Sequence, residues 1–257
     1  MTGQSSRLAR SIAFTAMVAA AATSLATPAG AVASGGPVPE GRYRFAVQLT
    51  MTGIPKPDGT GYASACSAAL VSPWWIITAG HCFHDPRRNP ASGSVPYETT
   101  ATVGRADLSH RTGHVAKVVS VRQAPSGDIA LAKLDRPVYD VVPLRVAEKA
   151  PRTGAVLRIT GWGKRAATDP APSRQLRTGQ VRVSSVAPVT VGVKGYRPAL
   201  DTSACEYDSG APYFAEPGRL PVLVSVESTG ASCPHDQEET TTRVDPLHDW
   251  IRETLLT

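Results

Sequence analysis

Short apolar segments separated by turn residues run along most of the chain. Between positions 42 and 51, apolar side chains occupy every second place, which predicts a half-buried strand. Positions 68–77 are apolar apart from a break at Ser72-Pro73, which predicts a buried hairpin. Further short strands are predicted at 101–103, 116–121, 129–134, 156–160, 180–186 and 222–226. Since no long helical period interrupts them, the predicted fold class is all-β, a barrel or sandwich without a parallel sheet.

The C-terminal segment has a different pattern. Asp245-Pro246 is a favourable helix start, because proline fits the first turn of a helix. The apolar residues that follow fall on one helical face: Leu247, Trp250, Ile251 and Leu255. We therefore expect a C-terminal helix that packs Trp250 on the β body.

Composition and charge fit a globular protein that does not bind nucleic acid. Of the 257 residues, 42% are hydrophobic and 19% charged, so the chain can bury a sizeable core. The net charge of +6 is diffuse, and no basic cluster is denser than Pro86-Arg87-Arg88. This distribution argues against a nucleic-acid partner.

The first 31 residues have the layout of a secretory signal. Arg7 and Arg10 precede an apolar run at 12–22, and Ala29-Gly30-Ala31 matches an A-x-A cleavage site. The apolar run is too short to span a membrane. We expect a signal peptide at 1–31 and a secreted, extracellular protein that has no membrane association once the signal is removed.

Four cysteines in an exported protein most simply form two disulfides, and four cysteines allow three pairings. A metal site is the poorer interpretation, because no Cys-x-x-Cys or paired-histidine spacing is present. The sequence thus indicates no metal and no cofactor.

Ser209 lies in the stretch 205–212, Cys-Glu-Tyr-Asp-Ser-Gly-Ala-Pro. Taken alone, Asp-Ser-Gly is typical of a solvated turn. Two upstream residues change this interpretation: His81, in Thr-Ala-Gly-His-Cys, and Asp128, which precedes Ile-Ala-Leu. A serine nucleophile needs a base to take its proton and an acid to orient that base. The order His, Asp, Ser and the missing G-x-S-x-G elbow argue against a lipase or esterase.

These motifs, together with Gly-Trp-Gly at 161–163, resemble those of the chymotrypsin-like (trypsin-family) serine proteases, of the secreted bacterial type. The resemblance implies two six-stranded antiparallel β-barrels with a C-terminal α-helix. It implies a peptidase domain at 32–257 with its active site between the barrels, and a connection between them at 164–177. It also pairs Cys66 with Cys82 and Cys205 with Cys233.

The same resemblance assigns roles to individual residues. His81 would be the general base, Asp128 would orient it and Ser209 would be the nucleophile. Ser225 matches the family serine that hydrogen-bonds the aspartate. The oxyanion hole would use the backbone N–H groups of Tyr207 and Ser209. Glycine is usual at the first of these positions, and a non-glycine residue resists positive φ, which would turn one amide away from the hole.

Activation and specificity follow from the resemblance as well. Family members bury a free α-amino group against the aspartate beside the nucleophile, here Asp208. Counting back along the first strand places that amino group at Val32, directly after Ala31. Signal cleavage would then itself create the Val32–Asp208 pair, and a cut before Ser34 is the alternative.

The substrate pocket of the family would have Ser203 at its base, where an aspartate usually selects Arg or Lys side chains. Two wall positions that are normally glycine fall at Glu227 and Glu239. These acids would attract a basic side chain or fill the pocket, unless they are solvated loop acids of a misaligned segment. Coulomb attraction favours a basic side chain at P1, the substrate residue before the cleaved bond.

We therefore expect a secreted, monomeric serine endopeptidase that hydrolyses protein or peptide substrates through an acyl-enzyme. The alternative is a protease-like fold retained as a binding or decoy protein, with its pocket occupied by Tyr207 and Glu227. The set of His81, Asp128 and Ser209 favours the enzyme, because a protein without catalytic demand would be expected to lose one member.

Overall fold

Six antiparallel strands form the first barrel of the computed structural model, which describes residues 1–2, 32–56, 58–218 and 220–257. The strands pair in the closed order β2-β3-β4-β7-β6-β5. Closure leaves no edge strand unpaired. The six strands are β2 (Ala46–Pro55), β3 (Gly61–Ser72), β4 (Trp75–Thr78), β5 (Glu98–Val103), β6 (His114–Gln123) and β7 (Ala130–Leu134).

A second antiparallel barrel follows in the chain. It consists of β9 (Val156–Gly161), β10 (Arg177–Val186), β11 (Thr190–Arg197), β12 (Pro212–Ala215), β13 (Val222–Thr229) and β14 (Glu239–Arg243). The path β10-β11-β14-β13-β12-β9 closes through the pairing of β9 with β10. Short β1 (Gly36–Pro37) extends the sheet beside β10, and β8 (Arg145–Val146) runs parallel to β13. Two six-stranded antiparallel barrels are thereby confirmed.

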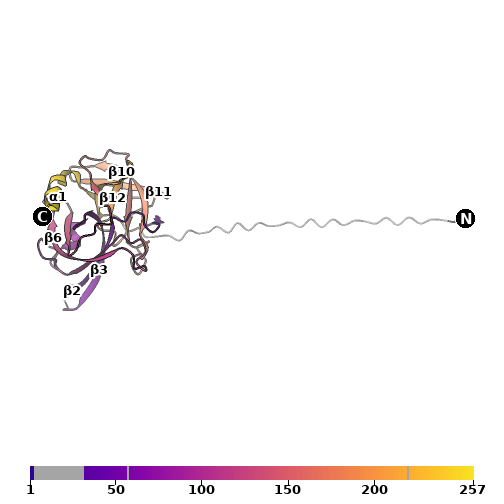
Figure 1. Cartoon of the computed structure of the whole chain (residues 1–257). Helices are drawn as coiled ribbons and strands as arrows, with labels where there is room; N and C mark the ends of the chain where they lie inside the picture. The colour runs from indigo at the N-terminus through magenta and orange to yellow at the C-terminus, as the bar shows by residue number, and fades with distance from the viewer. Residues whose placement is uncertain (3–31, 57, 219) are drawn as a thin grey trace.

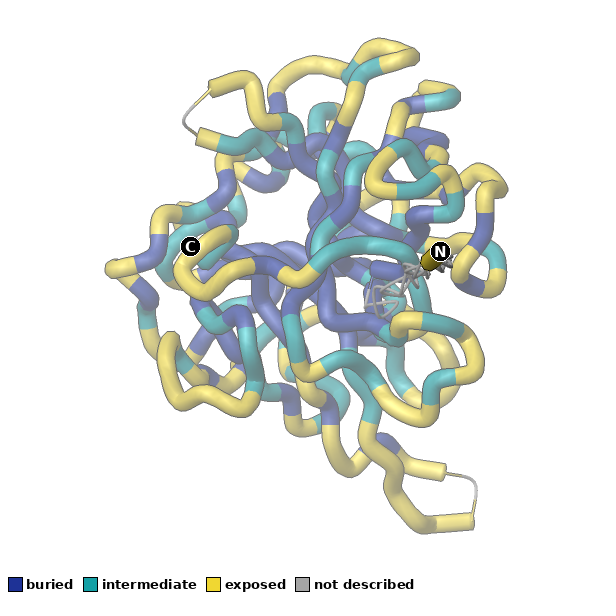
Figure 2. The backbone as a smooth tube through the Cα atoms, turned by 90° about the vertical axis from the view of Figure 1, so that its right-hand side faces the viewer, coloured by how far each residue is buried: buried dark blue, intermediate teal, exposed yellow. Residues whose placement is uncertain are grey.

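The two barrels lie against each other, with the labelled strands β2, β3 and β6 in the lower part of Figure 1 and β10, β11 and β12 in the upper part. Side chains alternate between the two faces of a strand, so every second residue points inward. In β10, Val181 and Val183 are buried whereas Arg182 between them is exposed. Figure 2 shows the buried backbone in the centre of the molecule and the exposed backbone in the peripheral loops.

A short C-terminal helix covers the β body, as the sequence predicts. A 3₁₀ turn, η2 (Asp245–Leu247), leads into α1 (His248–Leu255). Ile251 is buried, and Trp250 and Leu255 pack, partly buried, against the apolar cluster of the first barrel. The apolar face of the helix is therefore the face that contacts the barrel.

Some element boundaries differ from the prediction. β2 begins at Ala46 because Tyr43 has φ 50°, outside the extended region. The sequence did not predict β11, β12 or β14; β14 reads Glu-Thr-Thr-Thr-Arg and has no apolar alternation. The prediction that 164–177 connects the barrels is wrong: this segment joins β9 to β10, and 135–155 joins β7 to β9. Proline marks a loop but does not reveal which elements the loop joins.

Two disulfides cross-link the described part of the chain, one near the turn that carries His81 and one near the loop that carries Ser209. Disulfides join Cys66 to Cys82 and Cys205 to Cys233, the pairing that the resemblance implies. Within the described residues, none of the helices has the length and apolar character needed to cross a membrane. Positions 3–31 of the predicted signal peptide lie outside the described residues.

Candidate active site

His81 is held by the turn that follows β4. The turn η1 (Gly80–Phe83) carries it, and the Cys66–Cys82 disulfide ties this turn to β3. The ring Nδ1 of His81 lies 2.7 Å from Asp128 Oδ2, and its backbone N–H donates to Asp128 Oδ1 at 2.8 Å. A Cβ at Gly80 would lie 3.0 Å from that same Oδ1, so glycine permits the close approach. The two residues that the sequence assigned to base and orienting acid are thus in direct contact.

Asp128 lies two residues before the start of β7 and is partly buried. Burial by itself raises the pKa of a carboxyl group, but two partners oppose it here. Hydrogen bonds and charge from His81, and a hydrogen bond from Ser228, lower the pKa of Asp128 below its ordinary value. The acid is therefore ionised at neutral pH, and its oxygens accept hydrogen bonds from the residues around it.

The serine that binds Asp128 is Ser228, and the expectation for Ser225 is wrong. Ser228 Oγ donates to Asp128 Oδ2 at 2.7 Å, whereas Ser225 Oγ accepts from Thr241 Oγ1 at 2.8 Å. Ser228 is the extra residue of β13 where the register with β14 shifts between Glu227 and Thr229. A bulge inserts one residue and re-aims its side chain. Counting forward from Ser228 places the family's first glycine wall position at Gly230 instead of Glu227.

Ser209 lies in the loop between β11 and β12, fixed by its own backbone. Its carbonyl accepts from the Ser67 N–H at 2.8 Å, and the next N–H, of Gly210, donates to the Glu227 carbonyl at 3.0 Å. Gly210 has φ +84°, and a Cβ there would lie 2.0 Å from Thr78 Oγ1. Ser209 and His81 line one cavity of about 450 Å³ beside the Cys66–Cys82 disulfide. The loop therefore places the serine hydroxyl in the same cavity as the imidazole.

Tyr207 adopts the conformation that sequence reasoning expected it to resist. Its φ is +76°, and its carbonyl accepts from Ser67 Oγ at 3.3 Å. Lys164 Nζ lies 5.6 Å from the centre of its ring. No described residue accepts a hydrogen bond from the backbone N–H of Tyr207 or of Ser209. Both amides are thus unengaged by the part of the chain that the structure describes.

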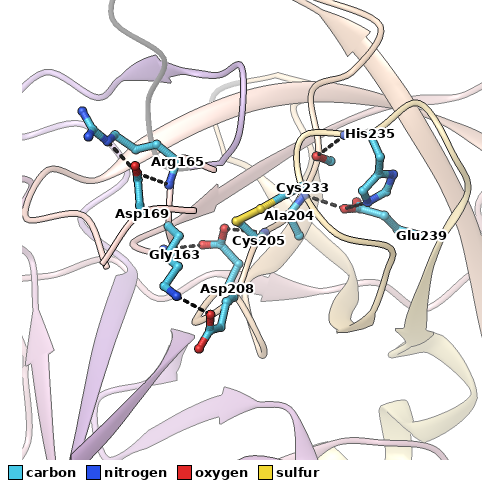
Figure 3. Close-up of a disulfide and its surroundings, with 12 residues drawn as sticks. Gly163, Arg165, Asp169, Ala204, Cys205, Asp208, Cys233, His235 and Glu239 are labelled. Carbon is cyan, nitrogen blue, oxygen red and sulfur yellow. Dashed lines mark hydrogen bonds and ion pairs between the residues drawn. A yellow bond between two sulfur atoms is a disulfide. The ribbon is translucent and has the colours of Figure 1, made fainter. Parts of the chain in front are cut away.

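Asp208 is fully buried behind this loop. Its carboxylate accepts from the N–H of Gly163 at 2.8 Å and of Cys205 at 3.0 Å, as Figure 3 shows, and from the N–H of Val32. Burial nevertheless raises the pKa of Asp208 to about 7. A Cβ at Gly161 or Gly163 would lie 2.0 Å or 2.3 Å from an Asp208 oxygen. The two glycines of the Gly-Trp-Gly motif therefore make room for this carboxyl group.

A second cavity, of about 190 Å³, opens beside Ser209 and is lined by Glu227 and Glu239. Both acids are buried, with side chains on adjacent strands, so they are not solvated loop residues. Neither Ser203 nor Ser225 lines this cavity. Ser203 is buried and accepts from the N–H of His235 at 3.2 Å.

Sequence reasoning missed three residues of this region: Ser228, Tyr213 and His235. Tyr213 and His235 both approach Glu239, the hydroxyl at 2.6 Å and the ring Nε2 at 3.5 Å. Neither belongs to a motif, and only the pairing of β12, β13 and β14 brings them together. Among the described residues, no group of three or more His, Cys, Asp or Glu side chains is placed to hold a metal ion.

Comparison with known proteins agrees with this architecture. A family model described as Trypsin matches residues 32–251, so the chain belongs to the trypsin family of serine proteases. It is 28% identical over 221 residues to the suppressor of tumorigenicity 14 protein homolog of Bos taurus, covering 75% of this chain and 25% of that protein. It is 27% identical over 248 residues to serine protease 56 of Mus musculus, covering 87% of this chain and 38% of that protein.

The chain thus spans 25% and 38% of the length of these two relatives. Both relatives are mammalian, so the comparisons do not support the bacterial type expected from the sequence.

Proposed function

We propose that this protein is a secreted serine endopeptidase that hydrolyses peptide bonds through an acyl-enzyme. The observation that carries the proposal is the contact of Asp128 with His81, which lines the same cavity as Ser209. A lone histidine or serine would carry no such inference. The combination of nucleophile, base and orienting acid is what acyl transfer by serine requires.

In the proposed mechanism, Ser209 Oγ attacks the substrate carbonyl while His81 takes its proton. Asp128 holds the imidazole through Nδ1 and stabilises the imidazolium that forms. The N–H groups of Tyr207 and Ser209 donate to the oxyanion. His81 then gives its proton to the leaving amine, and water hydrolyses the acyl-enzyme by the same steps in reverse order.

Activation would follow from cleavage after Ala31. The freed ammonium group of Val32 would form an ion pair with Asp208, whose carboxylate already accepts from the Val32 N–H. Val32 is fully buried, which supports a place for this terminus inside the protein. N-terminal sequencing of secreted protein tests this step: a start at Val32 supports it, and a start at Ser34 contradicts it.

The proposed substrate preference is a basic P1 side chain, because Glu227 and Glu239 line the cavity beside Ser209. Substrates would be proteins or peptides, and the enzyme would act as an extracellular monomer without a cofactor.

Labelling of Ser209 by a fluorophosphonate tests the proposal directly. We expect covalent modification at Ser209 in the wild type, loss in Ser209→Ala and strong reduction in His81→Ala. Ser92→Ala provides a matched control, because the one side-chain hydrogen bond of Ser92 among the described residues is accepted from the N–H of Gln123. If properly folded protein with a free Val32 is not labelled while trypsin is, the alternative of a protease-like binding or decoy protein replaces the proposal.

A further inference from the structure

Two buried carboxyl groups meet at one hydroxyl in the wall of the 190 Å³ cavity. Tyr213 Oη lies 2.8 Å from Glu227 Oε2 and 2.6 Å from Glu239 Oε2. A tyrosine hydroxyl has a single proton, so it donates to one carboxylate only. The second short oxygen–oxygen contact needs a proton on a carboxyl group. The cluster of Tyr213, Glu227 and Glu239 therefore holds one proton more than two ionised acids would.

This extra proton belongs to Glu227. The carboxylate of Glu239 also accepts from the Ala204 N–H at 2.5 Å and lies 3.5 Å from His235 Nε2, and Figure 3 shows all three residues beside the Cys205–Cys233 disulfide. Within the described residues, Glu227 has no side-chain hydrogen-bond partner besides Tyr213. Burial, followed by the charge of Glu239, raises the pKa of Glu227 well above its ordinary value.

The groups that face Glu227 make its ionisation unfavourable in the empty cavity. They come from four parts of the fold: Tyr213 of β12, Glu239 of β14, Asp208 beside the nucleophile and Asp128 before β7. Three of these are acids, and like charges within one buried site cannot all ionise freely. A base, His235, also lies beside Glu239: its contact with that carboxylate raises the pKa of its ring, and it approaches Oε1 whereas Tyr213 contacts Oε2.

We propose that the cavity takes a cationic P1 side chain in exchange for the proton of Glu227. This inference rests on the proposed function, since Ser209 at the cavity places the P1 residue. An ammonium or guanidinium group enters beside the two acids, Glu227 loses its proton to water, and the resulting carboxylate pairs with the cation. No covalent bond changes, and the charge within the cavity remains balanced. Glu227 is then a specificity-determining residue whose charge appears only when a basic side chain binds.

The exchange makes substrate selection depend on pH. While Glu227 is protonated in the free protein, each cation bound releases one proton, so affinity rises about tenfold for each pH unit. A neutral P1 side chain leaves the proton in place, so its affinity stays constant. Selectivity for basic over neutral P1 residues therefore grows with pH and levels off where Glu227 ionises by itself.

Isothermal titration calorimetry on the full chain carrying Ser209→Ala tests this exchange, because peptides then bind without being cleaved. Two peptides are compared that differ only at P1, one with arginine and one with its neutral isostere citrulline. Titrations at pH 6 and 7 in buffers of different ionisation enthalpy give the protons released on binding. We expect close to one proton released for the arginine peptide and none for citrulline, with a Kd about tenfold lower at pH 7 for arginine only.

Variants identify the source of the proton. Glu227→Gln is expected to abolish proton release and flatten the pH dependence. Glu238→Gln is the matched control, since Glu238 is exposed and accepts from Ser184 and Ser185 on the outer surface, and it should behave as wild type. His235→Asn should retain proton release. Release that survives in Glu227→Gln but disappears in His235→Asn overturns the proposal.

Two further outcomes also overturn it: equal affinity for arginine and citrulline, or tight arginine binding with no proton released in the protein with an intact cluster. The latter measurement needs no substitution at Glu227 and holds even where Glu227→Gln fails to fold. Fluorophosphonate labelling of Ser209 reports separately on the proposed function, so a protein that is not labelled but exchanges the proton would lose the enzyme proposal and keep a cation-binding cavity.

Discussion

Ser228 donates a 2.7 Å hydrogen bond to Asp128 Oδ2, the oxygen that also lies 2.7 Å from His81 Nδ1. In the proposed mechanism Ser228 is a positioning residue, because it contacts Asp128 and would act on His81 only through that carboxylate. The finding changes which serine of β13 should affect the proposed activity.

Ser228→Ala is expected to lower kcat/KM about 5- to 30-fold, equivalent to about 1–2 kcal/mol for a hydrogen bond to a charged acceptor. Loss of the donor also raises the pKa of Asp128 toward its ordinary value. A carboxyl group whose pKa is lowered in the folded state stabilises the fold above about pH 4, and this stabilisation is lost as pH falls and the group is protonated. The variant has less of it to lose, so its free energy of unfolding should fall less between pH 5 and pH 3 than that of wild type. Kinetics and urea unfolding at these pH values measure both effects.

Ser225→Ala serves as the control for this prediction. Ser225 contacts Thr241 and does not contact Asp128. In Ser225→Ala, kcat/KM and the change in free energy of unfolding between pH 5 and pH 3 should therefore stay close to wild type. A larger kinetic effect from Ser225→Ala than from Ser228→Ala would contradict the assignment.

Tyr207→Gly should stabilise the fold by about 1 kcal/mol, because glycine adopts φ +76° without the strain of a side chain. Activity in a peptide assay should be retained or increased, since the amide keeps its conformation. Tyr207→Ala distinguishes backbone strain from the effect of the ring, because it removes the ring beside Lys164 but keeps the Cβ. We therefore expect no increase in stability in Tyr207→Ala. Equal stability of the Gly and Ala variants in urea would refute the strain argument.

We expect Asp208 to make the free energy of unfolding depend on pH in the uncleaved chain, and we expect signal cleavage to remove this dependence. Its folded pKa of about 7 lies above the ordinary value near 4, so the folded state favours the protonated acid. Ionisation therefore destabilises the uncleaved chain as pH rises from about 4 to 7, by about 4 kcal/mol at most. Asp208→Asn in the uncleaved chain should remove this trend in urea unfolding.

A chain that begins at Val32 should also lack the trend, because its ammonium group lies beside the carboxylate and lowers the pKa of Asp208. If the cleaved and uncleaved forms lose stability equally between pH 5 and pH 7, the proposed Val32–Asp208 pair does not form.

Gly230→Ala is expected to obstruct the 190 Å³ cavity. A Cβ there would lie 3.1 Å from Glu239 Cγ and 3.4 Å from His235 Nε2, which presses on the acid that the cavity needs. KM for a substrate with P1 arginine should rise several-fold with a smaller change in kcat. Gly218→Ala is the matched control, because no atom lies within 4 Å of the added Cβ. Unchanged KM in Gly230→Ala would place the P1 side chain elsewhere.

Local patterns determined a large part of this protein. The apolar run at 68–77 located the hairpin of β3 and β4, and a short apolar segment located β10, where inward side chains repeat with period two. The same patterns missed β11, β12 and β14. The motif containing His81 and the acid at Asp128 indicated a contact that the structure contains. The motif predicts this contact because its other residues help to position His81: Gly80 leaves room for Asp128, and Cys82 ties the turn to β3 through its disulfide.

Tertiary structure decided what depends on register between distant strands. Ser228, at the register shift in β13, contacts Asp128 whereas Ser225 contacts Thr241, and a count along the sequence does not reveal where a bulge lies. Strand pairing also brings Glu227 and Glu239 to one hydroxyl of Tyr213, from three strands separated by loops of different length. The contact of His81 with Asp128, carried by local motifs, could therefore be predicted from the sequence. The cavity lined by Glu227 and Glu239 could not, because its residues become neighbours only when the second barrel closes.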